Sequence, residues 1–216
     1  KTGKCMVMVT PDAERTMNTY LGITSDFSAA ELHYEELKQS NYLYVEGYLV
    51  TSDTSRAAVL EARKVAKQHG VKMAMTFSDP SMATYFKVGL VEMLGEGVDV
   101  LFCNEEEAFA FTGKTNLKDA IQALKPLTQK LVITLGSEGA LVVNADNEVK
   151  IAAQAVKPLD TNGAGDMFAG AFLYGLTQGL SDAQAGALAS KAAAQIIQVY
   201  GARLDKQVHQ ELLKSV

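Results

Sequence analysis

Short apolar runs alternate with longer segments of helical periodicity along most of this chain, and this alternation restricts its fold more than any other feature. The runs expected to form strands are residues 42–45, 71–77, 98–102 and 131–135. The segments expected to form helices are residues 53–69, 82–94, 105–111 and 117–124. Such alternation predicts an α/β domain with a mostly parallel sheet, in which ligands bind at the carboxyl ends of the strands.

The beginning of the chain departs from this alternation. Residues 5–9 and 15–21 flank the turn signal Thr10-Pro11-Asp12 and predict a β-hairpin. After the hairpin, Ser28 and Glu31 have the spacing of a capping box, which predicts a short helix through residue 36.

The second half of the chain ends differently again. Residues 140–143 and 149–151 flank a turn at Asp146-Asn147 and predict a local antiparallel element. Small and apolar residues then recur with helical spacing at 165–175 and 183–200, and the alanine-rich second stretch suggests close helix packing.

Composition excludes several other classes of protein. Of the 216 residues, 48% are apolar and 21% charged, which is ordinary for a globular domain. No apolar run is long enough to span a bilayer and no signal peptide opens the chain, so we expect a cytoplasmic enzyme. A formal charge of −5 without a basic stripe disfavours nucleic-acid binding. Cys5 and Cys103 lack metal or redox spacing and are expected to be free thiols.

A glycine-rich heptapeptide, Asp160-Thr161-Asn162-Gly163-Ala164-Gly165-Asp166, lies at the start of an expected helix. Its small residues let backbone N–H groups approach an anion closely, and the helix start adds its dipole. Asp166 lies beside this cradle, where a carboxylate can accept the proton of an attacking hydroxyl. A bare Gly-x-Gly-Asp is more often an ordinary loop with a capping aspartate, whereas the complete heptapeptide favours a phosphoryl-transfer site.

An acidic segment, Asn104-Glu105-Glu106-Glu107, follows the strand expected at 98–102 and opens a helix. Asn104 and Glu107 share one helix face, where an amide and a carboxylate could orient water around Mg²⁺ and phosphate groups. Without further context, three adjacent acids are more often a solvated first turn that the helix dipole favours.

A third motif, Thr134-Leu135-Gly136-Ser137-Glu138-Gly139, closes the strand expected at 131–135. Two glycines three residues apart suit a plain hairpin turn as well as a loop that contacts a nucleotide. The motif alone leaves both interpretations open.

The heptapeptide resembles the C-terminal signature of the ribokinase (PfkB-type) carbohydrate kinase family, and its residue sequence is similar to that of the adenosine kinase branch. The resemblance implies that Asp166 is the catalytic base. It implies that the amides of Gly163, Ala164 and Gly165 form an anion hole. It also makes Asp160 a candidate ligand for a monovalent cation such as K⁺.

The two other motifs are similar to motifs of the same family. Asn104-x-x-Glu107 resembles its Asn-x-x-Glu motif, which implies that Asn104 contacts ATP and that Glu107 holds Mg²⁺ through water. On a late helix, counted back from Gly201-Ala202, the resemblance places Ser190 against the nucleotide, where relatives often carry Asn. The residues of the glycine loop that become candidate nucleotide contacts are Thr134, Gly136, Ser137 and Gly139.

The resemblance also implies a ribokinase-like three-layer α/β/α fold with β-lid strands at the start of the chain. Residues 1–24 are expected to be the lid hairpin, and residues 25–216 the nucleotide-binding and catalytic domain. The chain is expected to lack the family's N-terminal portion, which carries most of the acceptor contacts. On the lid, Arg15 is either a contact for acceptor or phosphate or an exposed edge charge that discourages strand pairing.

The function that these motifs indicate is an ATP-dependent kinase that transfers the γ-phosphoryl group to a hydroxyl of a nucleoside. The presence of Asn162 in the heptapeptide and the lid sequence favour adenosine, and a ribose- or fructose-type sugar is the alternative within the family. Outside it, the alternative is a non-catalytic nucleotide-binding module on the same fold. The expected cofactors are ATP and Mg²⁺, with K⁺ as a candidate. The expected partner is a small-molecule acceptor, without nucleic acid or membrane, and a homodimer through the lid is a further candidate.

Overall fold

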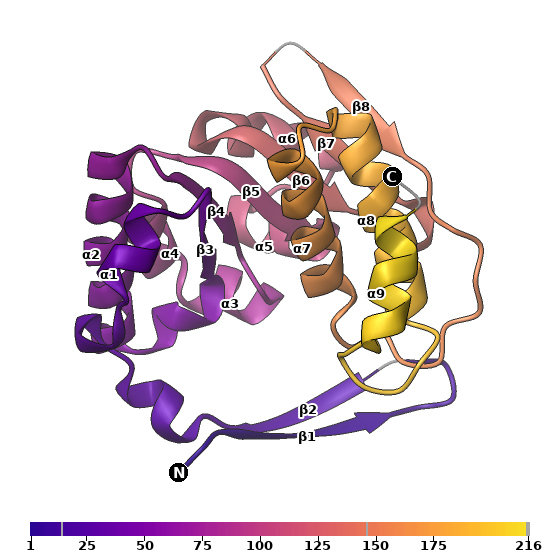
Figure 1. The fold of residues 1–216 in the computed structure, drawn as a ribbon, viewed down its shortest axis with the longest axis horizontal. Helices are drawn as coiled ribbons and strands as arrows, with labels where there is room; N and C mark the ends of the chain where they lie inside the picture. Colours follow the sequence, from indigo (N-terminus) through magenta and orange to yellow (C-terminus); the bar gives the residue numbers. More distant parts are fainter. Residues whose placement is uncertain (14, 146, 215–216) are drawn as a thin grey trace. The chain divides into compact units, whose positions relative to one another are not determined.

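The computed structural model describes residues 1–13, 15–145 and 147–214, and its strands lie in a larger and a smaller sheet (Figure 1). The larger sheet has the strand order β3-β4-β5-β6-β7-β8, and β3, β4 and β5 are parallel. The smaller sheet pairs β1 with β2 and is the expected hairpin. The strands are β1 (Lys4–Val9), β2 (Arg15–Tyr20), β3 (Tyr42–Glu46), β4 (Lys72–Thr76), β5 (Val98–Asn104), β6 (Thr128–Thr134), β7 (Ala140–Val143) and β8 (Glu148–Ile151). The predicted α/β class is confirmed.

The chain divides into two compact units. The first unit consists of Lys1–Lys4, Tyr20–Ile133 and Val143–Asn147. The second consists of Cys5–Thr19, Thr134–Val142 and the chain from Glu148 onward. Most of the hairpin therefore belongs to the same unit as the glycine-rich heptapeptide.

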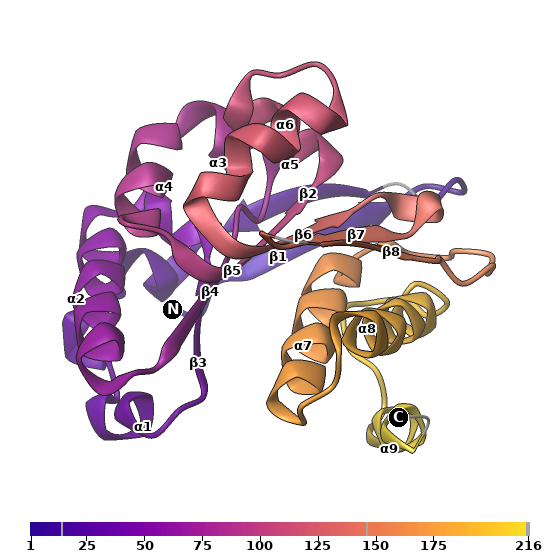
Figure 2. The same ribbon diagram turned by 90° about the horizontal axis from the view of Figure 1, so that it is seen from above.

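Helices of the first unit cover one side of its parallel strands, as Figure 2 shows for α2, α4 and α5. Helix α2 contacts β3 and β4, and α5 contacts β5. Phe77, which directly follows β4, is fully buried and stacks on Phe111 of α5 with ring centroids 4.3 Å apart. The helices of this unit are α1 (Tyr34–Lys38), α2 (Asp53–His69), α3 (Pro80–Tyr85), α4 (Lys87–Leu94), α5 (Glu105–Thr112) and α6 (Leu117–Leu124).

Helix α2 has the boundaries that the sequence predicts. At its start, the side chain of Ser52 accepts a hydrogen bond from the N–H of Ser55. At its end, Gly70 adopts a left-handed backbone with φ 70°, a conformation that glycine tolerates at little cost. Both signals act within one helical turn, so they can be recognised in the sequence alone.

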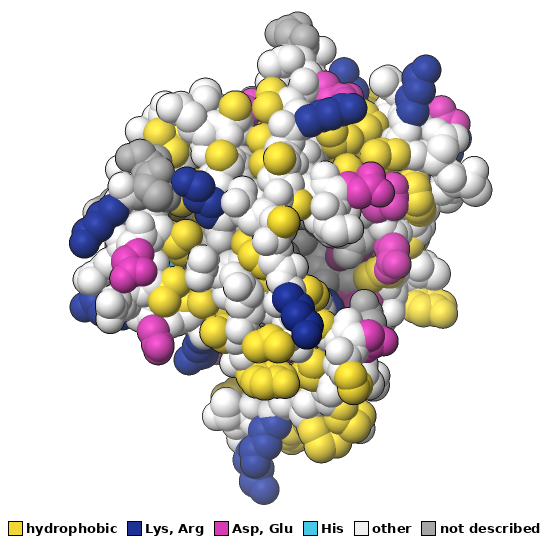
Figure 3. All heavy atoms as spheres, turned by 90° about the vertical axis from the view of Figure 1, so that its right-hand side faces the viewer, with side chains coloured by type: hydrophobic (Ala, Val, Ile, Leu, Met, Phe, Trp, Pro, Cys, Tyr) yellow, Lys and Arg dark blue, Asp and Glu magenta, His cyan; other side chains and the backbone are white. Residues whose placement is uncertain are grey.

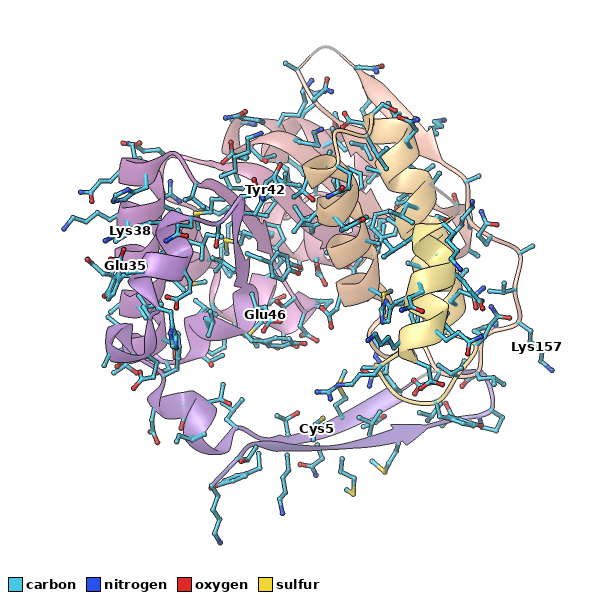
Figure 4. All side chains as sticks on the ribbon, in the orientation of Figure 1. Cys5, Glu35, Lys38, Tyr42, Glu46 and Lys157 are labelled. Atoms are coloured by element: carbon cyan, nitrogen blue, oxygen red, sulfur yellow. The ribbon has the colours of Figure 1, made fainter. Side chains whose placement is uncertain are left out.

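Two predicted helices are interrupted. The capping box of Ser28 and Glu31 is present, but it caps a single 3₁₀ turn because Leu32 is extended with ψ 126°. The turn is held to α2 by a hydrogen bond that Ser55 donates to the carbonyl of Phe27 (3.2 Å). Helix α1 then begins at Tyr34, where Lys38 donates to Glu35 on the exposed surface (2.6 Å; Figure 4).

The helix expected at 82–94 is likewise two helices. It begins earlier than predicted, at Pro80, because the side chain of Asp79 caps it by accepting from the N–H of Ser81 (2.7 Å). It is divided at Phe86, whose φ of −118° and ψ of 21° are not helical. Here the periodicity is correct and the continuity is wrong.

Three helices follow β8 in the second unit, α7 (Ala164–Thr177), α8 (Asp182–Ile196) and α9 (Lys206–Leu213). Helices α7 and α8 pack closely, since a Cβ added at Gly175 would lie 2.9 Å from the Cβ of Ala185. Helix α8 ends four residues before the predicted boundary, and the carbonyl of Ile197 instead accepts from the N–H groups of Leu159 (2.7 Å) and Asp160 (3.3 Å). Helix α9 was not predicted.

The surface agrees with the composition. On the face drawn in Figure 3, Lys and Arg side chains lie singly among acidic, polar and apolar ones. Among the residues that the structure describes, none of the helices is both long and apolar enough to cross a bilayer.

Candidate functional site

The glycine-rich turn leads directly into α7 in the second unit. Gly163 is the N-cap, has φ 79° and offers no side chain to the helix start, while the carbonyl of Thr161 accepts from the N–H of Ala164 (3.3 Å). The N–H groups of Gly165 and Asp166 lie in the first turn, where a helix has no internal acceptor for them. A Cβ added at Gly165 would meet no heavy atom within 4 Å. No side chain caps the first-turn amides, so those of Gly165 and Asp166 are available to an anion, as an anion hole for a phosphoryl group requires.

Gly163 has two reasons to be glycine. Its φ of 79° is left-handed, and a Cβ there would lie 2.9 Å from the Cβ of Ala202. The turn therefore packs against the segment that follows α8. This contact joins the heptapeptide to the Gly201-Ala202 pair.

Asp160 holds the turn through two hydrogen bonds to its carboxylate. Its side chain is 3% exposed, and its two carboxylate oxygens accept from the N–H groups of Asn162 and Gly201, each at 2.9 Å. One carboxylate thus connects the turn to a residue 41 positions later. The assignment of Asp160 to a monovalent cation stays a prediction. The contacts that the structure shows for its carboxylate are to backbone N–H groups of the protein.

Asp166 lies in the first turn of α7 with an exposed side chain. It directly follows Gly165, where an added Cβ would meet no heavy atom within 4 Å, so the carboxylate is accessible beside the first-turn amides. The helix dipole favours a negative charge at this end of the helix. The groups predicted to be general base and anion hole therefore lie within one helical turn.

The glycine loop after β6 is a tight turn. The N–H of Leu135 donates to the carbonyl of Gly139 (2.8 Å), and the N–H of Gly139 donates to the carbonyl of Gly136 (3.1 Å). Gly139 has φ 95°, and a Cβ there would overlap the carbonyl oxygen of Ile151. A Cβ at Gly136 would meet nothing within 4 Å, and Ser137 is exposed. The hairpin geometry is therefore present, and its nucleotide contacts, with those of Thr134, stay predictions.

Ser190 lies on α8 and is 7% exposed. Its hydroxyl donates to the carbonyl of Ala152 (2.8 Å), just after β8. The structure thus gives this side chain a partner within the protein, and its expected contact with a nucleotide stays a prediction.

Asn104 and Glu107 lie in the first unit, where β5 meets α5. They form a reciprocal capping box: the N–H of Glu107 donates to Asn104 Oδ1 (2.7 Å), and the N–H of Asn104 donates to Glu107 Oε2 (3.1 Å). Glu107 is 5% exposed, and the amide of Asn104 also donates to its Oε1 (3.0 Å). Burial raises the pKa of the neighbouring Cys103 thiol, and the charge of Glu107 adds to this effect. The two residues therefore have a structural role as the cap of α5, and their expected contacts with ATP and Mg²⁺ stay predictions.

One contact of the heptapeptide, a hydrogen bond from the hairpin, was not predicted from the sequence. Arg15, the first residue of β2, donates through Nη1 to the hydroxyl of Thr161 (2.8 Å). Arg15 is exposed, as one of the two expected alternatives requires, but neither alternative includes its partner in the heptapeptide. The signal that the sequence carries is only a threonine in the heptapeptide and a basic residue 146 positions earlier, which does not suffice to pair them.

Comparison with known proteins places this geometry in a family. The family model described as pfkB family carbohydrate kinase matches residues 1–208. An adenosine kinase of Saccharomyces cerevisiae is 32% identical over an alignment of 196 residues, and the match covers 82% of this chain and 56% of the yeast protein. A ribokinase of Lactococcus lactis is 29% identical over 170 residues, which are 79% of this chain and 52% of that protein.

The structural comparison agrees. The crystal structure of adenosine kinase from Sinorhizobium meliloti superposes with a TM-score of 0.95 at 31% identity, covering 99% of this chain and 66% of that one. The chain thus spans between half and two thirds of the length of these relatives. Its α/β sheet with a separate hairpin is the ribokinase-like fold that the sequence predicts. The chain belongs to the pfkB family of carbohydrate kinases.

Proposed function

We propose that the full-length protein is an ATP-dependent kinase that phosphorylates a hydroxyl group of a nucleoside. The observation that carries this proposal is the start of α7, where no side chain caps the first-turn amides and the carboxylate of Asp166 is exposed. Phosphoryl transfer requires mainly positioning and stabilisation of charge, and this arrangement supplies both.

In the proposed reaction, Asp166 accepts the proton of the acceptor hydroxyl as its oxygen attacks the γ-phosphorus of ATP in line with the departing ADP. The amides of Gly163, Ala164 and Gly165 stabilise the negative charge on the transferred group. Asp160 keeps these amides in place through its bonds to Asn162 and Gly201. Mg²⁺, when bound, neutralises charge on the ATP phosphates.

Asn104 and Glu107 are proposed to orient the water around that Mg²⁺. The donor set fits the ion, because a carboxylate and an amide oxygen are ligands of the hard type that magnesium prefers, directly or through water. Since the same pair caps α5, the proposal must be separated from the cap. The chain contains a matched pair for this purpose: Asn116 accepts from the N–H of Asp119 (3.0 Å) and donates to its carboxylate (2.9 Å) at the start of α6.

Replacing Glu107 with glutamine should therefore raise the Mg²⁺ concentration required for half-maximal turnover, whereas Asp119→Asn should not. Both substitutions weaken a cap, at a cost of about 0.5 to 2 kcal/mol. The check is a titration of turnover with Mg²⁺ at saturating ATP, accompanied by thermal unfolding of both variants. Equal Mg²⁺ dependence in the two variants would limit Glu107 to its structural role.

Adenosine is the acceptor that we propose first. Two of the relatives described above are adenosine kinases, and one is a ribokinase, so a sugar remains the second candidate. The experiment is to measure ADP production by the full-length protein with adenosine, other nucleosides, ribose and fructose in turn. We expect the fastest turnover with adenosine. ATP binding without turnover on any acceptor would contradict the kinase proposal and favour a nucleotide-binding module.

Three finer assignments belong to the same proposal. They are a K⁺ ion held with the help of Asp160, a homodimer through the hairpin, and a cytoplasmic location. The exposed apolar side chains of the hairpin support the second, among them Met6 (59% exposed) and Met8 (50%).

A further inference from the structure

The turn of the hairpin is fastened to the glycine-rich heptapeptide within the second unit. Ala13, in this turn, is 2% exposed and has φ 65°, a left-handed backbone that costs a non-glycine residue free energy. Its carbonyl accepts from the hydroxyl of Thr161 (3.2 Å), and Arg15 donates to the same hydroxyl (2.8 Å). A hydroxyl has one proton to donate. Thr161 donates this proton to the carbonyl of Ala13 and accepts a hydrogen bond from Arg15, so it is bonded to the hairpin in both ways.

The backbone of Thr161 belongs to the turn that precedes α7. Its carbonyl accepts from the N–H of Ala164, the first residue of the helix, and Asp160 before it is buried. Holding the side chain of Thr161 therefore restricts the orientation of its own peptide, and through it the amides that follow. The hairpin thus acts on the orientation of the proposed anion hole.

We propose that Arg15 is a positioning residue for the glycine-rich turn and acts through the hydroxyl of Thr161. The inference deepens the proposed kinase function and rests on it. A guanidinium at this place has further N–H groups and could instead act directly on a phosphate by its charge. The two modes predict different behaviour when Arg15 and Thr161 are changed together.

The test compares Arg15→Met, Thr161→Val and the double variant in the full-length protein. Each single change should lower kcat, by up to about 100-fold if the amides move by ~1 Å, with little change in the KM for ATP. The double variant should be no slower than the slower single one, because both changes remove the same interaction. Thr161→Ser, which keeps the hydroxyl, should restore turnover. Lys4→Met, which removes another positive charge of the hairpin, should leave kcat unchanged.

Two kinetic results would overturn the inference. One is normal kcat in Thr161→Val with impaired Arg15→Met, and the other is a double variant whose loss is the product of the two single losses. Either result would assign Arg15 to direct contact with the substrate.

Amide hydrogen exchange supplies a measurement that does not depend on turnover. Exchange in residues 160–166 should be faster in Arg15→Met and Thr161→Val and unchanged in Thr161→Ser, while exchange in α5 stays the same in all. Unchanged exchange at 160–166 in both variants would refute the coupling. If the wild-type protein phosphorylates no acceptor, the kinase proposal fails, and the exchange experiment still decides whether the hairpin orders the turn.

Discussion

Asp166→Asn is expected to lower the kcat of the full-length protein by about 10²- to 10⁴-fold, the contribution that a positioned general base makes. Asparagine has nearly the same shape but cannot accept the proton of the acceptor hydroxyl. Because the amides of the turn and the residues proposed to contact ATP are retained, the affinity for ATP should be preserved. Turnover under saturating substrates and calorimetric titration with ATP measure the two quantities separately.

The control for this variant is Asp182→Asn. Asp182 lies in the first turn of α8, as Asp166 does in α7, so both changes remove a negative charge that the helix dipole favours. That term contributes only about 0.3 to 1 kcal/mol to stability and does not affect proton transfer. We expect normal kcat in Asp182→Asn. Turnover of Asp166→Asn at a rate comparable with the wild type would remove Asp166 from the role of base.

Asp160→Asn is expected to have the largest effect on stability among the site variants. Both oxygens of this buried carboxylate accept from backbone N–H groups, and an amide offers only one oxygen. Its NH₂ group would face the N–H of either Asn162 or Gly201 and leave a buried donor without a partner. The expected loss is about 1 to 3 kcal/mol in the free energy of unfolding, together with a lower kcat because the turn is displaced.

Chemical denaturation of the wild type and the variant measures this loss. Asp53→Asn is the matched control, since the side chain of Asp53 is 92% exposed and its ion pair with Arg56 lies on the surface. Such pairs contribute about 0 to 1 kcal/mol. If Asp160→Asn were as stable as Asp53→Asn, the carboxylate could not be what holds the turn to Gly201.

The features that were correct from the sequence depend on neighbours within a few residues. The limits of α2 follow from Ser52 and Gly70, and the capping box predicted from the spacing of Ser28 and Glu31 is present. The helix predicted at the end of the heptapeptide is likewise present, as α7.

The errors concern where helices are interrupted and one short helix. The division at Phe86 and the extended residue Leu32 follow no local signal, and the second is accompanied by the bond from Ser55 to Phe27. Helix α9 was missed because its apolar spacing is short, with only Val208, Leu212 and Leu213 as apolar side chains. Local periodicity indicates the type of an element better than its continuity, since tertiary contacts compete with propensity at each break.

By itself, the sequence determined the α/β class and the family, and it supplied the residues that we propose to carry chemistry, because these depend on periodicity and on short motifs. Only the tertiary structure decided what holds those residues in place. The carboxylate of Asp160 finds Gly201 across 41 positions, and the hydroxyl of Thr161 finds Arg15 across 146. Such partners cannot be read from a linear pattern, because a hydrogen bond requires two groups at about 3 Å and the chain between them leaves that distance undetermined.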